Sequence, residues 1–234
     1  MISIVQQYGL AFLCWDGYKI SGLAMTLWLL IISCAIGFCL ALPLSIARNA
    51  RSPFVWFPVW LYTFLFRGTP LYVQLLLIYS GIYALDFIHN TPPFNEFFRQ
   101  AINCTILSFA LNTGAYTTEI FAGAIRETAH GEVDAALAMA MSRVTMYRRI
   151  DIPSALRRAL PAYSNEVILM LHATTLAFTA TVPDILKVAN DAYSATYDPF
   201  DSFTAAAIIY LCVSFTLIFI FRRAEQHFLA FLKP

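Results

Sequence analysis

The sequence predicts an all-α integral membrane protein with five transmembrane helices, the N-terminus outside and one large loop in the cytoplasm. Of its 234 residues, 59% are hydrophobic and 12% are charged, whereas soluble domains carry about 25% charged residues. Several apolar runs reach the length of about 20 residues that crosses the hydrocarbon core. Lysine and arginine gather in alternate loops. We therefore expect a single transmembrane domain over residues 1–234.

Five apolar segments are the predicted spans, at residues 22–46, 54–85, 102–124, 161–182 and 203–221. The second is too long for one simple crossing, and its interior Arg67-Gly68-Thr69-Pro70 predicts a break or kink. The first run exceeds the short apolar region of a signal peptide, and no Lys or Arg precedes Lys19, so we do not expect a removable signal. Between the spans we expect a short amphipathic stretch at 1–21, a polar loop at 86–100 and an acidic loop at 184–202.

The basic residues predict the orientation. Segments 48–53, 126–161 and 222–234 carry eleven of the 15 Lys and Arg residues, and segments 1–21, 86–100 and 184–202 carry three. Because cytoplasmic loops are enriched in Lys and Arg, the first set is expected inside. Five spans and no internal repeat argue against the inverted halves of a secondary transporter. A unit this small favours a pore formed between two such chains.

Several kinds of site are absent from the sequence. There is no G-x-x-x-x-G-K-[ST] loop, no H-E-x-x-H and no G-x-S-x-G, so we expect no ATP site of that type and no enzyme active site. The five cysteines show no CxxC pair and no metal-ligand spacing, which indicates neither a disulfide framework nor a metal site.

The long polar segment 126–160 predicts a docking element. Apolar residues recur at helical spacing between Val133 and Val144, and Glu132 and Asp134 fall in the first turn, where carboxylates favour the helix dipole. Ser142 is expected to start a second, basic segment that stops at Pro153. A short amphipathic helix, a turn and a helix at the cytoplasmic face suit contact with another protein.

Ionisable residues at bilayer depth indicate functional sites. Glu166 and its neighbour Asn165 lie in the fourth span, where a carboxylate either attracts the cationic group of a substrate, pairs with Arg67 or caps a broken helix. Glu119 near the cytoplasmic end is expected to be structural. His172 is expected to make a helix–helix contact rather than to bind a ligand.

The segment around Arg67, Thr69 and Gln74 has two interpretations. Interrupting a span with Gly and Pro exposes backbone groups, which is tolerated beside protein or a water-filled path. These ends either bind the charged ends of a substrate or form only a packing kink.

Three stretches of the polar loop resemble the EAA loop of ATP-binding-cassette import permeases: Gly131-Glu132-Val133-Asp134-Ala135-Ala136, Ala140-Met141-Ser142 and Ile150-Asp151-Ile152-Pro153. In that family the loop forms a coupling helix held by the ATPase subunit. The resemblance implies a coupling role for Gly131, Glu132, Asp134, Ala135, Ala136, Ala140, Arg143 and Pro153. Asp134 replaces the usual Glu and keeps its charge. Ala140 replaces the usual Gly, and its added methyl group puts the usual turn geometry in question.

Further stretches are similar to polar-amino-acid permeases of this family, from about Gly22 to Arg223. They are Arg67–Leu75, Ala115–Arg126, Pro161–Glu166, and Tyr163–His172 followed by Thr175–Asp184. The last two resemble most the M-type subunits of histidine, lysine, arginine and ornithine importers of Gram-negative bacteria. Many relatives have Lys-Asp at His172-Ala173, so expectations for that end of the span do not carry over.

The resemblance implies a type I importer permease in the bacterial inner membrane, without a cofactor of its own. It implies a heterodimer with a homologous Q-type permease, two ATP-binding subunits that hold ATP and Mg, and a periplasmic amino-acid-binding protein, with no nucleic-acid partner. Substrate contacts are then expected from Glu166, Asn165, Thr69, Arg67 and Gln74, with the partner's equivalent carboxylate as an alternative to Glu166. Two other classes compete, an ion-coupled carrier or channel in which Glu166 or Glu119 titrates, and a membrane enzyme using His172 and Glu166.

Overall fold

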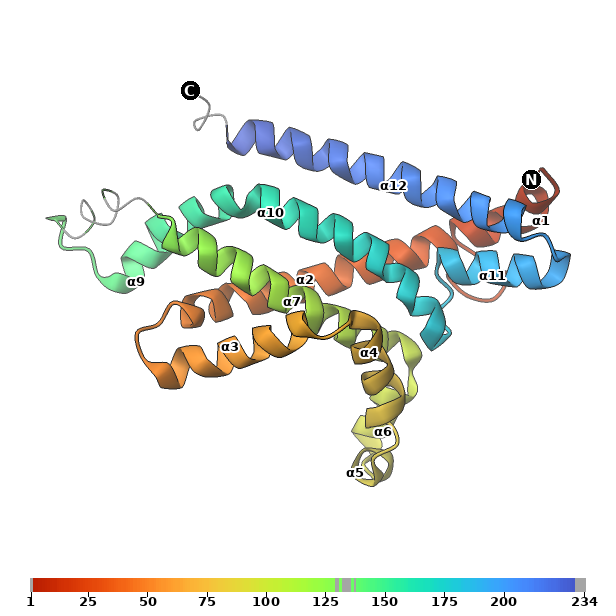
Figure 1. Ribbon diagram of the computed structural model, residues 1–234, viewed down its shortest axis with the longest axis horizontal. Helices are drawn as coiled ribbons and strands as arrows, with labels where there is room; N and C mark the ends of the chain where they lie inside the picture. The colour runs from red at the N-terminus through yellow and green to blue at the C-terminus, as the bar shows by residue number, and fades with distance from the viewer. Residues whose placement is uncertain (1, 129–130, 132–135, 137, 230–234) are drawn as a thin grey trace.

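Four long helices run side by side along the long axis of the computed structural model (Figure 1), which describes residues 2–128, 131, 136 and 138–229. They are α2 (Gly22–Arg48), α7 (Ala101–Arg126), α10 (Ile152–Ala173) and α12 (Pro199–Phe228). Their centre is a core around Leu29, Phe109 and Leu171, each with 0% of its surface exposed. The predicted helical segments at 22–46, 102–124 and 203–221 form, the first two slightly longer than expected and the third extended at both ends to Pro199–Phe228.

Small residues let α2 and α7 approach closely. A Cβ built on Gly37 would lie 2.6 Å from Cγ2 of Thr113 and 3.0 Å from the backbone nitrogen of Gly114. Helices in membranes associate through such small-residue contacts, because lipid gives no hydrophobic drive for association. The sequence thus makes α2 and α7 one tightly packed pair to which the other helices attach.

The predicted break in the second apolar segment is present. Helix α3 (Pro53–Gly68) and the following α4 (Leu71–Leu76) with its π-helical continuation Leu77–Ile82 meet at a bend of 104°. Pro70 lies at this bend, where it cannot donate the hydrogen bond that would continue α3. The chain then leaves the bundle sideways through α5 (Asp86–Asn90) and α6 (Pro92–Arg99) (Figure 1).

The structure contains more helix than the sequence predicts, in two predicted loops and at the start of the fourth helix. The predicted polar loop 86–100 contains α5 and α6, and the acidic loop 184–202 contains α11 (Ile185–Thr196). The basic segment does not stop at Pro153, and the fourth long helix begins at Ile152, before Pro161. Short α9 (Arg143–Met146) continues through a π-helical turn, Tyr147–Asp151, into α10, whose first turn contains Pro153 and whose interior contains Pro161. Proline is tolerated in a first turn because its missing N–H has no intrahelical partner there.

Helix α10 ends in a 3₁₀ segment, Thr174–Ala180, and Asp184 then caps α11. The Asp184 carboxylate accepts hydrogen bonds from the Lys187 backbone N–H at 2.9 Å and from the Tyr210 hydroxyl at 3.3 Å. Burial raises the pKa of this carboxyl to about 7. Helix α11 packs with α1 (Ile2–Leu13) through Phe12 and Ile185, so the first and last thirds of the chain meet at one end of the bundle.

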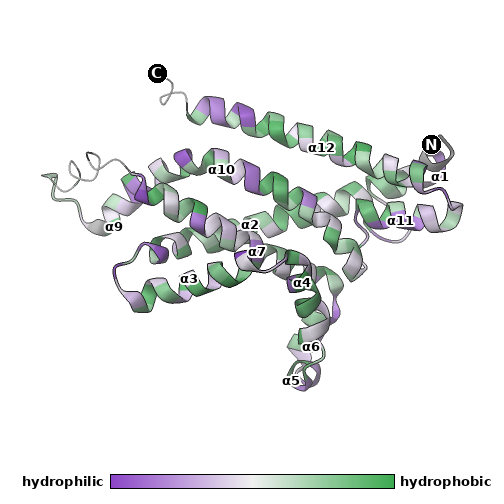
Figure 2. Ribbon diagram, viewed as in Figure 1, coloured by the Kyte–Doolittle hydropathy of each residue, from purple (hydrophilic) through white to green (hydrophobic). Residues whose placement is uncertain are grey.

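The hydropathy pattern supports a membrane location (Figure 2). By length and apolar character, α2 and α12 of the described residues could each cross a membrane, and the bent α3–α4 pair could form a third crossing. Helices α7 and α10 carry polar residues in their interiors, including Glu119 and Glu166. That is the reason they do not stand out by apolar character alone.

Candidate functional site

Two amide side chains hold the bend between α3 and α4 together. The Gln74 amide nitrogen donates to the Phe66 carbonyl at 2.8 Å, the Thr69 carbonyl at 3.0 Å and the Thr69 hydroxyl at 2.8 Å. The Asn112 amide nitrogen of α7 donates to the Phe66 carbonyl and to the Gln74 side-chain oxygen, both at 3.1 Å. Carbonyls at a helix C-terminus lack intrahelical hydrogen-bond donors, and the two amide groups are the donors here. Thr69 and Gln74 are thus brought together to stabilise the break.

Arg67 lies beside this bend but on its exposed side. Its guanidinium sits 5.4 Å from the centre of the Tyr116 ring, a cation–π distance, and the Tyr116 hydroxyl donates to the Arg67 carbonyl at 3.4 Å. Arg67 lines an open cavity of about 320 Å³ together with Arg48, Trp60 and Glu119. The cavity offers both signs of charge beside an aromatic ring.

Glu119 is held by α2 and α3. Its Oε1 accepts from Nε of Arg48 at 2.7 Å and from the Thr63 hydroxyl at 2.8 Å. The ion pair joins residues 71 positions apart in the chain, so its Arg48 partner was missed from the sequence. Glu119 thus ties three helices together, as expected of a structural residue.

Glu166 occupies a different environment on α10. Its side chain is 7% exposed, and the Thr113 hydroxyl of α7 is its hydrogen-bonding neighbour. Arg67 and Glu166, both in the described part of the chain, form no direct ion pair, although the positive charge of Arg67 acts on the Glu166 carboxylate from a longer distance. Glu166 is a buried carboxylate with a neutral hydroxyl beside it.

The predicted pair Glu166 and Asn165 does not share one face of α10. Asn165 is exposed, and so is His172 two turns later. The His172 ring nitrogen lies 3.3 Å from the Ser214 hydroxyl of α12, the helix–helix contact expected of this histidine. Glu166 instead turns toward α7 through Thr113.

Helix α7 contacts both groups of predicted substrate residues. Asn112 binds Gln74 on one side of α7, and the next residue, Thr113, neighbours Glu166 on another. The structure therefore brings Thr69 and Gln74 together but places Glu166 and Asn165 apart from them. These contacts are completed by three polar residues of α7, Asn112, Thr113 and Tyr116. What marks them in the sequence is that they are polar residues in a predicted span.

The described part of the coupling loop shows a helix end and a new helix start. Ala136 is buried, Gly131 is exposed, and Glu132, Asp134 and Ala135 lie outside the described residues. Ala140 has a positive φ of 52°, and the Met141 N–H donates to the Ala136 carbonyl at 3.1 Å. This is the Schellman pattern, in which a left-handed residue ends a helix. Ala140 thus adopts the left-handed conformation typical of glycine, in spite of its methyl group.

The second half of the loop starts at Ser142, as predicted. Its hydroxyl accepts from the Thr145 N–H at 3.3 Å, so it caps α9, whose first residue is Arg143. Pro153 lies in the first turn of α10 and joins the loop to that helix without a break.

Arg158, which the sequence did not single out, connects the two ends of the loop. Its guanidinium donates to the Ala124 carbonyl at 3.2 Å and the Thr128 hydroxyl at 2.8 Å, both at the end of α7. The same group donates to the Ser154 hydroxyl of α10 at 2.7 Å. Thr128 is 7% exposed, so these bonds form inside the protein. Helices α7 and α10 are thereby fastened together directly beneath the coupling loop.

Within residues 2–128, 131, 136 and 138–229, no cluster of three or more His, Cys, Asp or Glu side chains could hold a metal ion. The charged groups described above are instead arranged as pairs and hydrogen-bonded networks between helices.

Comparison with known proteins identifies the family. Residues 37–229 match the family described as "Binding-protein-dependent transport system inner membrane component". The chain is 58% identical over 234 residues to the histidine/lysine/arginine/ornithine transport system permease protein HisM of Escherichia coli strain K12, covering 100% of this chain and 98% of HisM. It is 39% identical over 206 residues to the octopine transport system permease protein OccM of Rhizobium meliloti, covering 88% and 84% of the two chains.

Solved structures of ABC transporters share the fold of this chain. A crystal structure of an amino acid ABC transporter with histidines superimposes with a TM-score of 0.82 at 29% identity, covering 97% of both chains. A chain of the MetNI methionine ABC transporter shares the fold, with a TM-score of 0.72 at 14% identity over 87% of this chain and 93% of that one. The relatives are permease proteins, so this chain is a non-catalytic permease subunit, as the sequence predicts. The chain belongs to the family of inner membrane components of binding-protein-dependent transport systems.

Proposed function

We propose that the chain is one half of the translocation pathway of an ATP-driven importer for basic amino acids. The observation that carries this proposal is the 58% identity over the whole chain to a permease named for histidine, lysine, arginine and ornithine. The buried carboxylate Glu166 supports a cationic substrate, because its side chain forms no ion pair among the described residues and a buried charge is stabilised by a directly paired cation.

The substrate contacts that we propose are revised by the geometry. Glu166 binds the cationic side chain, and Arg67, exposed at the bend, is placed for a carboxylate. Asn165 on the exposed face of α10 contributes a polar contact. Thr69 and Gln74 act indirectly, since their hydrogen bonds fix the bend that presents Arg67. The Arg67 charge acts on the Glu166 carboxylate without forming an ion pair with it, so in this proposal the two groups bind opposite ends of one amino acid.

We propose five crossings with the N-terminus outside: α2, the bent α3–α4 pair, α7, α10 and α12. The arrangement in Figure 1 supports this sidedness. The N-terminus and α11 lie at one end of the bundle, and α9 and the end of α12 lie at the other. The basic segments 48–53, 126–161 and 222–234 then face the cytoplasm, as Lys and Arg distribution requires.

ATP and Mg belong to a partner ATPase in this proposal, and the loop between α7 and α10 transmits its movement. Two ATP-binding subunits, a homologous permease chain and a periplasmic amino-acid-binding protein complete the transporter. Closure of the ATPase pair moves the loop. The Arg158 clasp, which is the set of hydrogen bonds from Arg158 to Ser154 and Thr128, makes α7 and α10 move together. The pathway then changes its exposure from outside to inside.

The test is uptake of radiolabelled arginine into proteoliposomes that contain this chain, its partner permease and the ATPase. We expect uptake that requires both ATP and the binding protein. Uptake driven by a proton or sodium gradient without ATP would contradict the proposal and favour an ion-coupled carrier in which Glu166 titrates. Competition with unlabelled histidine, lysine, ornithine and a neutral amino acid then defines the substrate class.

A further inference from the structure

An apolar cavity between α10 and α12 is not used by the proposed transport cycle. It has a volume of about 400 Å³ and lies near the end of the bundle that carries α9. Its inner wall is a cluster of three rings, Phe38, Phe121 and Tyr163, with centroids 5.4 to 5.8 Å apart. Edge-to-face rings at this distance pack stably, so the wall is preformed.

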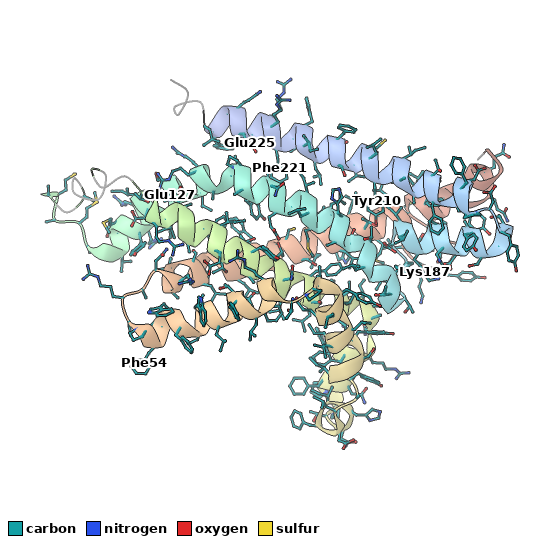
Figure 3. All side chains as sticks on the ribbon, in the orientation of Figure 1. Phe54, Glu127, Lys187, Tyr210, Phe221 and Glu225 are labelled. Carbon is teal, nitrogen blue, oxygen red and sulfur yellow. The ribbon has the colours of Figure 1, made fainter. Side chains whose placement is uncertain are left out.

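The side walls come from the two helices that frame the cavity. Leu156 and Leu160 of α10 form one side, and Phe221 and Phe228 of α12 form the other. Figure 3 labels Phe221 and Glu225 on the side of α12 that faces α10, where the Glu225 carboxylate accepts a hydrogen bond from the Ser164 hydroxyl at 2.8 Å. This bond holds α12 against α10 while leaving the space between them open.

The cavity crosses the predicted inner boundary of the membrane. Phe38, Phe121 and Phe221 belong to predicted spans, and Leu156 and Phe228 lie beyond them. An empty apolar cavity forfeits dispersion contacts, and water lacks polar partners in it. Since the outer side of α12 also exposes large apolar residues such as Leu211, Phe215 and Phe219, hydrocarbon chains of the bilayer are the apolar material available to fill it.

The charge at this end is complementary to an anionic headgroup. Of the described residues that line the cavity, Arg157 alone is charged. Arg222 directly follows Phe221 and is exposed, whereas the Arg223 guanidinium lies 5.1 Å from the centre of the Phe219 ring, on the outer side of α12. Guanidinium groups bind phosphate in a bidentate manner, and basic pockets between helices on the cytoplasmic side bind anionic lipid headgroups. Glu225, the carboxylate of the same stretch, accepts a hydrogen bond from Ser164 and does not line the cavity, and Arg157 also interacts with a group of the protein, so a headgroup would share its guanidinium.

We propose that this cavity is a binding site for an anionic phospholipid of the cytoplasmic leaflet. One acyl chain occupies the space between α10 and α12, and the phosphate lies at Arg157, with Arg222 beside it. The lipid completes the packing between the helix that continues the coupling loop and the last helix. This inference does not depend on which solute is transported.

The test is native mass spectrometry of the assembled transporter after exchange into phosphatidylglycerol or phosphatidylcholine with identical acyl chains. We expect phosphatidylglycerol to be retained about fivefold more than phosphatidylcholine, the ratio for roughly one basic contact. Arg157→Gln is expected to remove the preference and Arg157→Lys to keep part of it. Leu160→Trp fills the cavity and is expected to lower retention of both lipids. Arg51→Gln, an exposed arginine in the α2–α3 turn, and Leu211→Trp, on the outer side of α12, are the matched controls.

Equal retention of the two lipids by the unchanged protein would overturn the anionic headgroup. Unchanged retention in both Arg157→Gln and Leu160→Trp would overturn the site. Inorganic phosphate that displaces the lipid completely would identify a free-anion site instead. If Leu160→Trp prevents assembly, the site is tested instead on the unchanged protein, by photocrosslinking with a phosphatidylglycerol that carries a photoreactive acyl chain. Adducts on residues 153–163 or 221–228 support the cavity, and adducts found only elsewhere contradict it.

Discussion

Glu119 and Glu166 are two carboxylates at bilayer depth with different surroundings. Glu119 accepts from Arg48 and Thr63, so its charge is already balanced within the chain. Glu166 has the Thr113 hydroxyl beside it and no ion pair among the described residues. Breaking a balanced pair destabilises a protein because it leaves one charge alone. Our proposal that Glu166 binds the cationic group of the substrate rests on this absence of a direct ion pair.

We predict that Glu166→Gln lowers the apparent affinity for arginine and lysine roughly 10- to 100-fold, because a hydrogen bond to a charged group contributes about 1.5–3 kcal/mol. Glutamine keeps the shape and can still accept from Thr113, so assembly should be normal. The measurement is the concentration dependence of uptake in proteoliposomes. Glu119→Gln is the matched comparison and should reduce the yield of assembled complex. Wild-type affinity in Glu166→Gln would show that the substrate's cation binds elsewhere.

Ala140 is strained in a way that its neighbours are not. An L-residue in the left-handed conformation costs roughly 1–2 kcal/mol, while glycine visits it freely. We therefore predict that Ala140→Gly raises the stability of the chain by about 1 kcal/mol, measured as a higher thermal unfolding midpoint of the complex. Ala138→Gly, two residues earlier at an exposed helical position, should lower it by a similar amount. Changes of the same sign at both positions would contradict the left-handed turn.

At the scale of elements, the bend between α3 and α4 depends on Gln74 and Asn112. Replacing Asn112 by alanine leaves the buried side-chain oxygen of Gln74 without its donor, and replacing Gln74 removes the side-chain donor to the Thr69 carbonyl. Loss of a buried hydrogen-bond partner costs about 1–3 kcal/mol. Because the two amides also bind each other, we predict that Gln74→Ala and Asn112→Ala are not additive. Thermal unfolding of the two single variants and the double variant gives the coupling energy. Simple additivity would show that the two amides act independently.

The Arg158 clasp suggests how the loop transmits force. We predict that Arg158→Ala lowers uptake at least tenfold while the ATPase subunits stay bound, because α7 and α10 then move separately. The readout is the ratio of ATP hydrolysed to arginine transported, which should rise. A simple folding defect would lower both activities in proportion and leave this ratio unchanged. Arg51→Ala, an exposed arginine of the same predicted surface, is the control.

Local signals in the sequence predict the long helices and the bend at Gly68–Pro70, because apolar length and Gly-Pro interruption act over a few residues. They fail where a helix is short or polar. The sequence predicts loops where helices α5, α6 and α11 form, and it predicts a helix end at Pro153, although proline is accepted in the first turn of a helix. The site contacts depend on residues far apart, such as Arg48 with Glu119. Only folding brings such pairs together.

At the scale of the whole molecule, the ends of the bundle differ in charge and in the segments they gather. One end holds the N-terminus and α11, where Asp184 caps the helix and Lys187 pairs with Asp191. The other holds α9, the α2–α3 turn and the end of α12, with most of the arginines. A membrane protein with this division has one orientation that satisfies the distribution of Lys and Arg. Helices α5 and α6 leave the bundle sideways between the two ends.

This division yields a direct test of five crossings and an outside N-terminus. In intact spheroplasts we predict that a membrane-impermeant maleimide labels native Cys14, which is exposed. In a Cys14→Ser background, His89→Cys and Ser194→Cys should also react in intact cells, because the proposed topology places segments 86–100 and 184–202 outside. Ser52→Cys, Arg148→Cys and Gln226→Cys should react only after permeabilisation. The order of labelling along the chain then alternates at every predicted crossing. Two consecutive positions on the same side would remove the crossing between them, and a fully reversed pattern would invert the orientation.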